Sequence, residues 1–189
     1  MSAQIKTIFA VASLAGLLTA CGADNSVNSK TNGAAMNIQI TSTAFAEGQP
    51  IPEKYAYENK DLSPALQWSG VPPAAKSLAL ICDDPDAPMG TWVHWVVYDL
   101  PPTATGLSEG VPKSPELVNG AKQGVNDYKK TGYGGPCPPP GRPHRYFFKL
   151  YALDTLLNLN SGATKAGLLK AMDGHVLAEG QLMGTYQRK

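Results

Sequence analysis

Residues 77–100 read SLALICDDPDAPMGTWVHWVVYDL and contain two apolar runs joined by a short acidic segment. The runs Ser77–Cys82 and Trp92–Asp99 have the length and character of buried strands. Between them, residues 83–88 (DDPDAP) include two prolines, each of which favours extended backbone at the preceding residue and removes one backbone donor. We therefore predict two adjacent strands whose connecting segment holds its carboxylates in a fixed arrangement.

The second run is expected to alternate strictly between two faces, because successive side chains of a strand point to opposite sides. One face would carry Trp92, His94, Val96 and Tyr98, and the other Val93, Trp95, Val97 and Asp99. The prolines at 101 and 102 end the run. This pattern predicts that His94 projects from a strand beside the acidic segment.

A second window, Gly132–Asp154, reads GYGGPCPPPGRPHRYFFKLYALD. Nine of the twelve positions from Gly132 to Pro143 are Gly or Pro, and the run leads directly into an alternating segment, His144–Ala152. Glycines allow close approach of the backbone, and prolines hold a loop in one shape. Two of the three histidines of the chain lie in these two windows. We therefore expect a site where residues 77–100 and 132–154 meet.

The remaining signals are mostly β. Strands are predicted over Asn37–Ser42 and Ala65–Trp68, and a helix over Thr164–Met172 followed by a second short helical turn at Val176–Ala178. Residues 103–132 lack periodicity and are expected to form a long loop that is either functional or mobile. Short strands separated by proline-rich turns are typical of a β-sandwich.

The first twenty residues have the pattern of an export signal. Lys6 precedes a fourteen-residue uncharged run, which is shorter than the roughly 20 residues of a membrane-spanning helix. The run ends in LTAC, which resembles the cleavage box of bacterial lipoproteins, where the cysteine becomes the lipidated first residue. We predict a lipoprotein signal peptide at residues 1–20 and lipidation of Cys21. An ordinary signal peptide that leaves Cys21 free is the alternative.

By resemblance to enterobacterial lipoproteins, Gly22 rather than Asp points to the outer membrane, facing the periplasm. Residues 21–35 would be the lipidated cysteine and a flexible polar tether, and residues 36–189 one domain. Without Lys6, fifteen basic residues balance fifteen acidic residues, so no charge excess favours nucleic acid as a partner.

The DPDAP motif followed by a strand with a histidine, the GGPCPPPG segment leading into HRY, and the C-terminal GHVLAEGQLMGTY resemble the phosphatidylethanolamine-binding protein family, also called Raf kinase inhibitor proteins. The resemblance covers about Met36–Tyr186. Only Met89–Thr91 lie between Pro88 and Trp92, which resembles the bacterial branch, so kinase inhibition is not transferred. The resemblance implies a mostly β, antiparallel Greek-key β-sandwich with short peripheral and C-terminal helices and a small anion cavity.

Matched onto this chain, the resemblance implies these ligand-binding residues: Asp84, Asp86, Pro88, His94, Gly134, Gly135, His144 and Tyr146. Two imidazoles can donate hydrogen bonds to an oxyanion, and the glycines offer backbone N–H groups. Asp84 can orient one imidazole, favour its charged form and attract an ammonium group. The expected ligand is therefore a small anion or a phospholipid head group resembling phosphoethanolamine.

Two other classes of function stay open at this point. A cysteine-dependent hydrolase would use Cys137 as nucleophile, His144 as base and Asp84 to orient it. An interaction protein that inhibits a protease or kinase would use the rim of the cavity. We favour a binding protein without catalysis.

We expect no cofactor and no metal. A metal site formed by His94, His144 and the acidic segment is chemically conceivable, but the sequence lacks a closely spaced ligand pair. The sequence also leaves open a Cys82–Cys137 disulfide and a cis proline within Asp84–Pro88.

Overall fold

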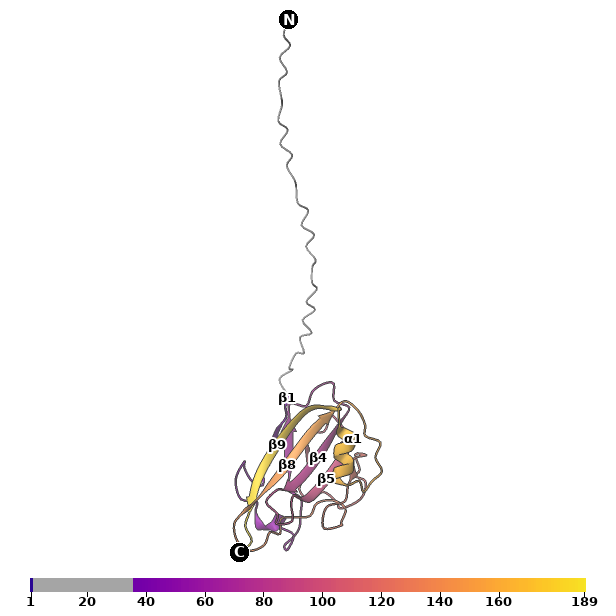
Figure 1. Ribbon diagram of the computed structural model, residues 1–189. Helices are drawn as coiled ribbons and strands as arrows, with labels where there is room; N and C mark the ends of the chain where they lie inside the picture. The colour runs from indigo at the N-terminus through magenta and orange to yellow at the C-terminus, as the bar shows by residue number, and fades with distance from the viewer. Residues whose placement is uncertain (2–35) are drawn as a thin grey trace. The chain divides into compact units, whose positions relative to one another are not determined.

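The structure is a computed structural model that describes Met1 and residues 36–189 (Figure 1). The predicted signal peptide at residues 1–20, the lipidation site Cys21 and the tether up to residue 35 lie outside the described residues. In the part of the chain that is described, no helix is long and apolar enough to cross a membrane.

The described domain is mostly β, as predicted. In chain order its elements are β1 (Met36–Asn37), β2 (Gln39–Thr41), the 3₁₀ helix η1 (Glu53–Tyr55), β3 (Leu66–Ser69), β4 (Ser77–Asp84), β5 (Trp92–Leu100), β6 (Gly106–Leu107), β7 (Lys122–Gln123), β8 (His144–Leu153), α1 (Lys165–Met172) and β9 (Val176–Tyr186). The strands expected from residues 77–100 and 132–154 are therefore β4, β5 and β8.

The strands form a larger sheet in the order β1-β9-β8-β4-β5-β7 and a smaller sheet in the order β2-β3-β6. Within the larger sheet, β8-β4-β5-β7 is the Greek-key order, in which the fourth strand returns beside the first. Figure 1 shows β9, β8, β4 and β5 side by side. The antiparallel prediction holds for the strand pairs of the described domain except β1 with β9, which is parallel.

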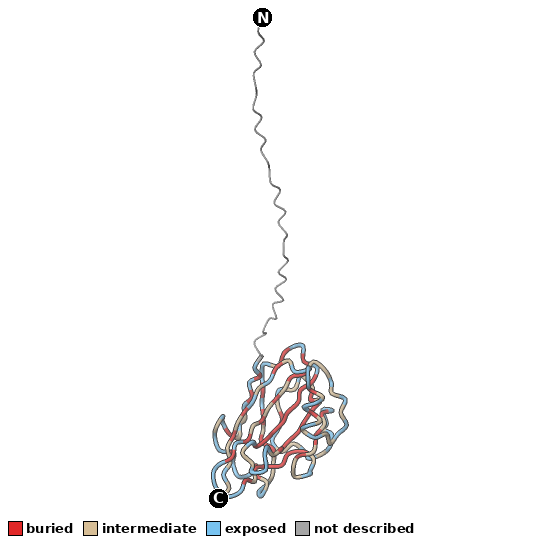
Figure 2. Tube along the Cα trace, in the orientation of Figure 1, coloured by how far each residue is buried: buried red, intermediate tan, exposed pale blue. Residues whose placement is uncertain are grey.

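Apolar side chains cover both faces of the larger sheet. Between the two sheets, Trp68 of β3 belongs to the same buried cluster as Trp95 of β5 and Phe148 of β8. On the other face, Leu168 and Met172 of α1 are buried with side chains of β4 and β5. All eight residues of β4 are consequently buried, and the central strands are red in Figure 2. The strand predicted from Ser77–Cys82, β4, thus lies between β8 and β5 in the larger sheet and is buried on both faces.

The C-terminal region corrects one prediction. The helix is confirmed, and the hydroxyl oxygen of its N-cap Thr164 accepts the Gly167 N–H at 3.2 Å. The helical turn predicted at Val176–Ala178 is wrong, because these residues begin the eleven-residue strand β9. Gly180 weakens the strand signal, but a Cβ there would lie 1.9 Å from the Ile38 carbonyl oxygen. Close passage of another chain segment therefore requires a glycine within this strand.

The strict alternation predicted for β5 is also wrong. Cys82 pairs with Trp95 and Asp83 with Val93, so His94 is an extra residue in a β-bulge. Beyond the bulge the faces exchange: Trp95 and Val97 lie in the core between the sheets, whereas Val96 and Tyr98 pack on the side of α1. The bulge thus interrupts the alternation of faces at His94, and the next residue, Trp95, lies in the core between the sheets.

Residues 103–132 are held by specific contacts rather than forming a free loop. They include β6 and β7, and the amide of Gln123 donates to the carbonyl oxygens of Pro112 and Ser114, each at 2.7 Å. Its side-chain oxygen accepts the Trp95 indole N–H at 2.7 Å. Gln123 is fully buried. This amide therefore fastens the segment to β5, close to the histidine of the bulge.

Candidate functional site

A cavity of about 230 Å³ lies where the acidic segment, β5, β8 and the Gly/Pro-rich segment meet. It is lined by Asp84, Ala87, Pro88, Trp92, His94, Tyr128, Cys137, Pro138, Pro139, His144 and Tyr146. Five of the eight predicted ligand-binding residues are in this lining: Asp84, Pro88, His94, His144 and Tyr146. Residues about 60 positions apart in the chain meet here, as expected from the two sequence windows. Their binding of a ligand stays a prediction.

His144 and Asp84 form a buried pair at the junction of β8 and β4. The ring Nδ1 of His144 donates to Oδ2 of Asp84 at 2.7 Å, and the other carboxylate oxygen accepts the Asp86 N–H at 2.8 Å. Only 7% of the His144 side chain and 4% of the Asp84 side chain are exposed. The carboxylate therefore fixes the orientation and tautomer of the ring, as predicted for Asp84.

His94 is held by a backbone carbonyl instead of a carboxylate. Its Nδ1 lies 2.6 Å from the Gly134 carbonyl oxygen, and since a carbonyl only accepts, Nδ1 carries the proton. Burial lowers the pKa of His94 below its ordinary 6.5, against the opposing effect of the Gly134 hydrogen bond. The ring is therefore neutral near pH 7. Its edge packs against the face of Tyr146, with 5.1 Å between ring centroids.

Two hydrogen-bond donors in the cavity wall have no protein partner. Within residues 36–189, the buried side-chain nitrogen and oxygen atoms that lack a hydrogen bond are Nε1 of Trp92 and the hydroxyl of Tyr146. Burial raises the pKa of Tyr146 far above its ordinary value, so the hydroxyl keeps its proton. Leaving a buried polar group unpaired costs roughly 1–3 kcal/mol. Trp92 and Tyr146 both line this cavity, where a ligand with acceptor atoms would pair the two donors.

Asp86 lies at the rim and is outside the lining. The Nε and Nη2 atoms of Arg145 each donate to the Asp86 carboxylate at 2.9 Å, and the backbone N–H of Arg145 donates to the same carboxylate at 3.0 Å. These side-chain hydrogen bonds lower the pKa of Asp86 to about 2. The carboxylate of Asp86 is therefore paired with Arg145. Asp86 does not line the cavity.

The predicted use of the Gly134 and Gly135 N–H groups by an anion is not available in this structure. Gly134 donates to the His94 carbonyl oxygen at 2.9 Å, and Gly135 donates to the Asp61 carboxylate at 2.7 Å. A Cβ on Gly135 would lie 2.1 Å from the Tyr55 carbonyl oxygen. Gly135 is thus required for close packing against residues 55–57, and Gly134 for the close approach of the Tyr128 ring.

The sequence interpretation missed several lining residues, above all Trp92, Tyr128 and the prolines at 138 and 139. Tyr128 comes from the aperiodic segment 103–132, where no local pattern distinguishes it. Its ring stacks on Tyr57 at 4.2 Å, and its hydroxyl donates to the Gly135 carbonyl oxygen at 3.0 Å. For Trp92 a signal existed, because the predicted alternation placed it on the same face as His94.

The described residues contain neither the Cys82–Cys137 disulfide nor the cis proline that the sequence left open. Cys82 and Cys137 are free thiols in the structure, and the described residues contain no cis peptide bond. Among the same residues, no three His, Cys, Asp or Glu side chains are grouped so that they would hold a metal ion.

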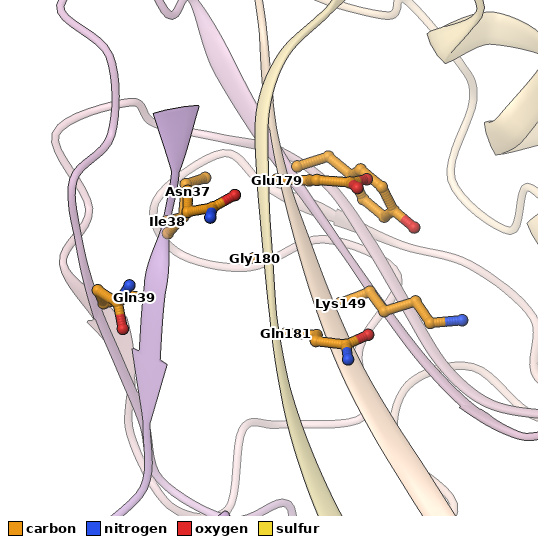
Figure 3. A pocket seen from close by; sticks show the side chains of 8 residues that line it. Asn37, Ile38, Gln39, Lys149, Glu179, Gly180 and Gln181 are labelled. Carbon is orange, nitrogen blue, oxygen red and sulfur yellow. The ribbon is translucent and has the colours of Figure 1, made fainter. Parts of the chain in front are cut away.

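A second hollow, of about 430 Å³, lies over β9 on the outside of the larger sheet (Figure 3). Glu179, Gln181 and Lys149 lie on one side of the β9 ribbon, and Asn37 and Gln39 on the other. None of the predicted ligand-binding residues lines it, and neither orphaned donor is there. The cavity between the two histidines is therefore the stronger candidate.

Comparison with known proteins found relatives that match most of the chain. The profile of the family described as phosphatidylethanolamine-binding protein matches residues 41–187. A UPF0098 protein of Methanothermobacter thermautotrophicus is 53% identical over 151 residues, which cover 80% of this chain and 99% of the relative. A UPF0098 protein of Aquifex aeolicus is 48% identical, over 80% of this chain and 89% of the relative.

Two solved structures are similar over most of the chain. A phosphatidylethanolamine-binding protein homologue of Chlamydia trachomatis has 46% sequence identity and a TM-score of 0.74, covering 82% of this chain and all of that one. YbcL of E. coli, described as a new member of the mammalian PEBP family, has 34% identity and a TM-score of 0.76, covering 81% and 99%. Placement in the bacterial branch stays a prediction. The chain belongs to the phosphatidylethanolamine-binding protein family.

Proposed function

We propose that this protein is a binding protein whose cavity takes a small oxyanion, either phosphate or the phosphate of a phospholipid head group resembling phosphoethanolamine. The observation that carries the proposal is the pair of orphaned donors, Tyr146 and Trp92, in the wall of one small cavity. An oxyanion offers several acceptor atoms within the span of a few ångströms. It would pair both donors at once and relieve the cost of their burial.

The two imidazoles offer further hydrogen-bonding atoms to such a ligand, of which Nε2 of the neutral His94 is an acceptor and not a donor. In His94 and His144 the Nδ1 atom is committed to a protein acceptor, so Nε2 is the ring nitrogen left for a ligand. The lining contains neither Lys nor Arg, and Arg145 at the rim is held by Asp86. Binding would therefore depend on directional hydrogen bonds in a poorly solvated site rather than on an ion pair with a free cation.

The contacts of Cys137 favour binding over catalysis. Burial, followed by the negative charge of Glu58, raises the pKa of the Cys137 thiol. A nucleophilic cysteine needs the opposite shift, because the thiolate is the reactive form. We propose no hydrolase activity, and no observation on the described surface favours an inhibitor of proteases or kinases.

We also propose that the protein is exported and held by a lipid on Cys21, at the outer membrane facing the periplasm. The support is the sequence pattern around LTAC alone. Mass spectrometry of the mature N-terminal peptide should find a diacylglyceryl-modified Cys21, and Cys21→Ser should move the protein from the membrane to the soluble fraction. A mature chain that begins elsewhere, with an unmodified Cys21, contradicts the anchor.

The binding proposal is tested by Tyr146→Phe, which removes only the orphaned hydroxyl. In a calorimetric titration with inorganic phosphate, we expect the affinity to fall about tenfold, because a hydrogen bond to a charged group contributes about 1.5–3 kcal/mol. The melting temperature without ligand should stay the same or rise, since an unpaired buried hydroxyl is lost.

Tyr151→Phe is the matched control. Tyr151 is a half-buried tyrosine of the same strand and lines the other hollow, not the cavity. It should bind phosphate like the wild type. Equal phosphate affinity in Tyr146→Phe and the wild type would show that the hydroxyl does not contact the anion.

A further inference from the structure

The polar groups of the cavity are of two kinds, and this combination restricts the ligand beyond a general preference for anions. The Tyr146 hydroxyl and the Trp92 indole N–H are donors. The Nε2 atom of His94, by contrast, is an acceptor, because Nδ1 of the neutral ring carries the proton that is given to the Gly134 carbonyl oxygen at 2.6 Å. Besides Nε2 of His144, whose Nδ1 is paired with Asp84, an anion placed here meets two donors and one lone pair.

The surroundings of His94 maintain this neutral form. Asp84 and Asp127 are the nearby acidic groups that favour a charged ring, and the rings of Tyr128 and Tyr146 pack against it at 5.8 and 5.1 Å. Burial outweighs the two carboxylates, so the pKa of His94 is lowered. The imidazole of His144, which also lines the cavity, is engaged by Asp84 through Nδ1.

Phosphate esters differ in whether they can satisfy that lone pair. A phosphodiester carries one negative charge but no hydrogen on oxygen, so it would place an acceptor against the acceptor of His94. The monoanion of a phosphomonoester has the same charge and one P–O–H group. Its hydroxyl can donate to Nε2 of His94 while its other oxygens accept from Tyr146 and Trp92.

Resting on the oxyanion-binding function proposed above, we propose that the cavity selects the protonated monoanion of a phosphomonoester and discriminates against phosphodiesters. The P–O–H group donates to His94, and the charged oxygens pair with the two orphaned donors. Phosphatidic acid and free phosphomonoesters share this chemistry, whereas the phosphodiester of phosphatidylethanolamine lacks it.

The cavity also provides no dedicated partner for an ammonium group. Asp84 is the acidic residue of the lining, and its two oxygens accept from His144 and from the Asp86 N–H. The carboxylate of Asp86 is gripped by Arg145. A simple monoester without an amine is therefore a sufficient ligand, and the ethanolamine group should add little.

The test compares ethyl phosphate with dimethyl phosphate, which are isomers and have the same charge as monoanions. Titrated into the purified protein at pH 7, where His94 is neutral, and with affinities expressed per monoanion, ethyl phosphate should bind at least about tenfold more tightly, because the diester leaves a buried acceptor facing an acceptor. The second pKa of a phosphomonoester is about 6. Since the bound ester keeps its proton, its apparent affinity should fall about tenfold per pH unit above that value.

The variant His94→Asn tests whether His94 causes the preference for the monoester over the diester. An asparagine amide can still donate to the Gly134 carbonyl oxygen but no longer presents the Nε2 acceptor. The ratio of the two affinities should fall toward one, a change that loss of stability alone would not produce. A ratio that stays at the wild-type value in this variant overturns the role of His94.

The possible outcomes separate this inference from the function on which it rests. Equal binding of ethyl phosphate and dimethyl phosphate overturns the selectivity and leaves oxyanion binding intact. No binding of inorganic phosphate or of either ester at millimolar concentration removes both proposals.

Vesicles distinguish the two sources of the monoester. Phosphatidylcholine vesicles that contain phosphatidic acid should retain the protein if the source is a lipid, and Tyr146→Phe should abolish this retention. Retention instead by vesicles with phosphatidylethanolamine, and not by those with phosphatidic acid, contradicts the inference. Binding of ethyl phosphate without retention by either vesicle assigns a soluble monoester.

Discussion

Replacement of His144 by alanine is expected to abolish most phosphate binding and to destabilise the folded protein. The substitution removes a ring nitrogen from the cavity and leaves the buried Asp84 carboxylate with the Asp86 N–H as its remaining hydrogen bond. Breaking a buried pair in this way costs about 3 kcal/mol, and loss of a hydrogen bond to a charged ligand weakens binding by about tenfold or more. Urea denaturation and phosphate titration measure the two effects.

His175→Ala is the matched control for this experiment. His175 also donates through Nδ1 to a carboxylate at 2.7 Å, in Asp154, but 46% of each side chain is exposed. An exposed pair contributes about 1 kcal/mol or less. This variant should therefore keep phosphate affinity and nearly all stability. If His144→Ala behaved like His175→Ala in both measurements, the buried pair would have no role in either.

Trp95→Ala is expected to cause the largest loss of stability of the changes considered, about 3–5 kcal/mol. Trp95 is fully buried, its ring meets Tyr133 edge-on at 5.5 Å, and its indole N–H satisfies the amide oxygen of Gln123. Truncation therefore opens a cavity between the two sheets and unfastens residues 103–132 from β5. The free energy of unfolding in urea measures the effect.

Trp95→Phe separates packing from hydrogen bonding. Phenylalanine keeps most of the apolar volume but leaves the Gln123 oxygen without its donor, so we expect a loss of about 1–3 kcal/mol. A Trp95→Ala variant that lost less than Trp95→Phe would contradict the assignment of Trp95 to the core between the sheets.

The sequence predicted those parts of the fold that depend on local pattern. β4, β5 and β8 were identified because their apolar runs are long and are bounded by proline. Asp84, His94, His144 and Tyr146 were identified as a group from the family resemblance, and for His94 and His144 the position on a strand beside a stiff segment pointed the same way. Helix α1 was identified from its spacing of Leu and Met.

The sequence interpretation failed where contacts between distant segments decide the structure. The glycine at 180 is required by the passage of Ile38, so β9 carries a weak strand signal of its own. The bulge at His94 exists only in relation to β4, and Tyr128 reaches the cavity through the anchoring of residues 103–132 by Gln123. The N–H groups of Gly134 and Gly135 are used by His94 and Asp61, which no local pattern reveals.

Binding of an oxyanion between the two buried imidazoles is the central claim, and an NMR titration with inorganic phosphate tests it most directly. The chain has three histidines, so the ring signals of His94 and His144 can be followed with His175 as an internal reference. We predict saturable shifts of both buried rings with a single dissociation constant, while the exposed His175 does not change. Absence of any response of His94 and His144 at millimolar phosphate would contradict the claim.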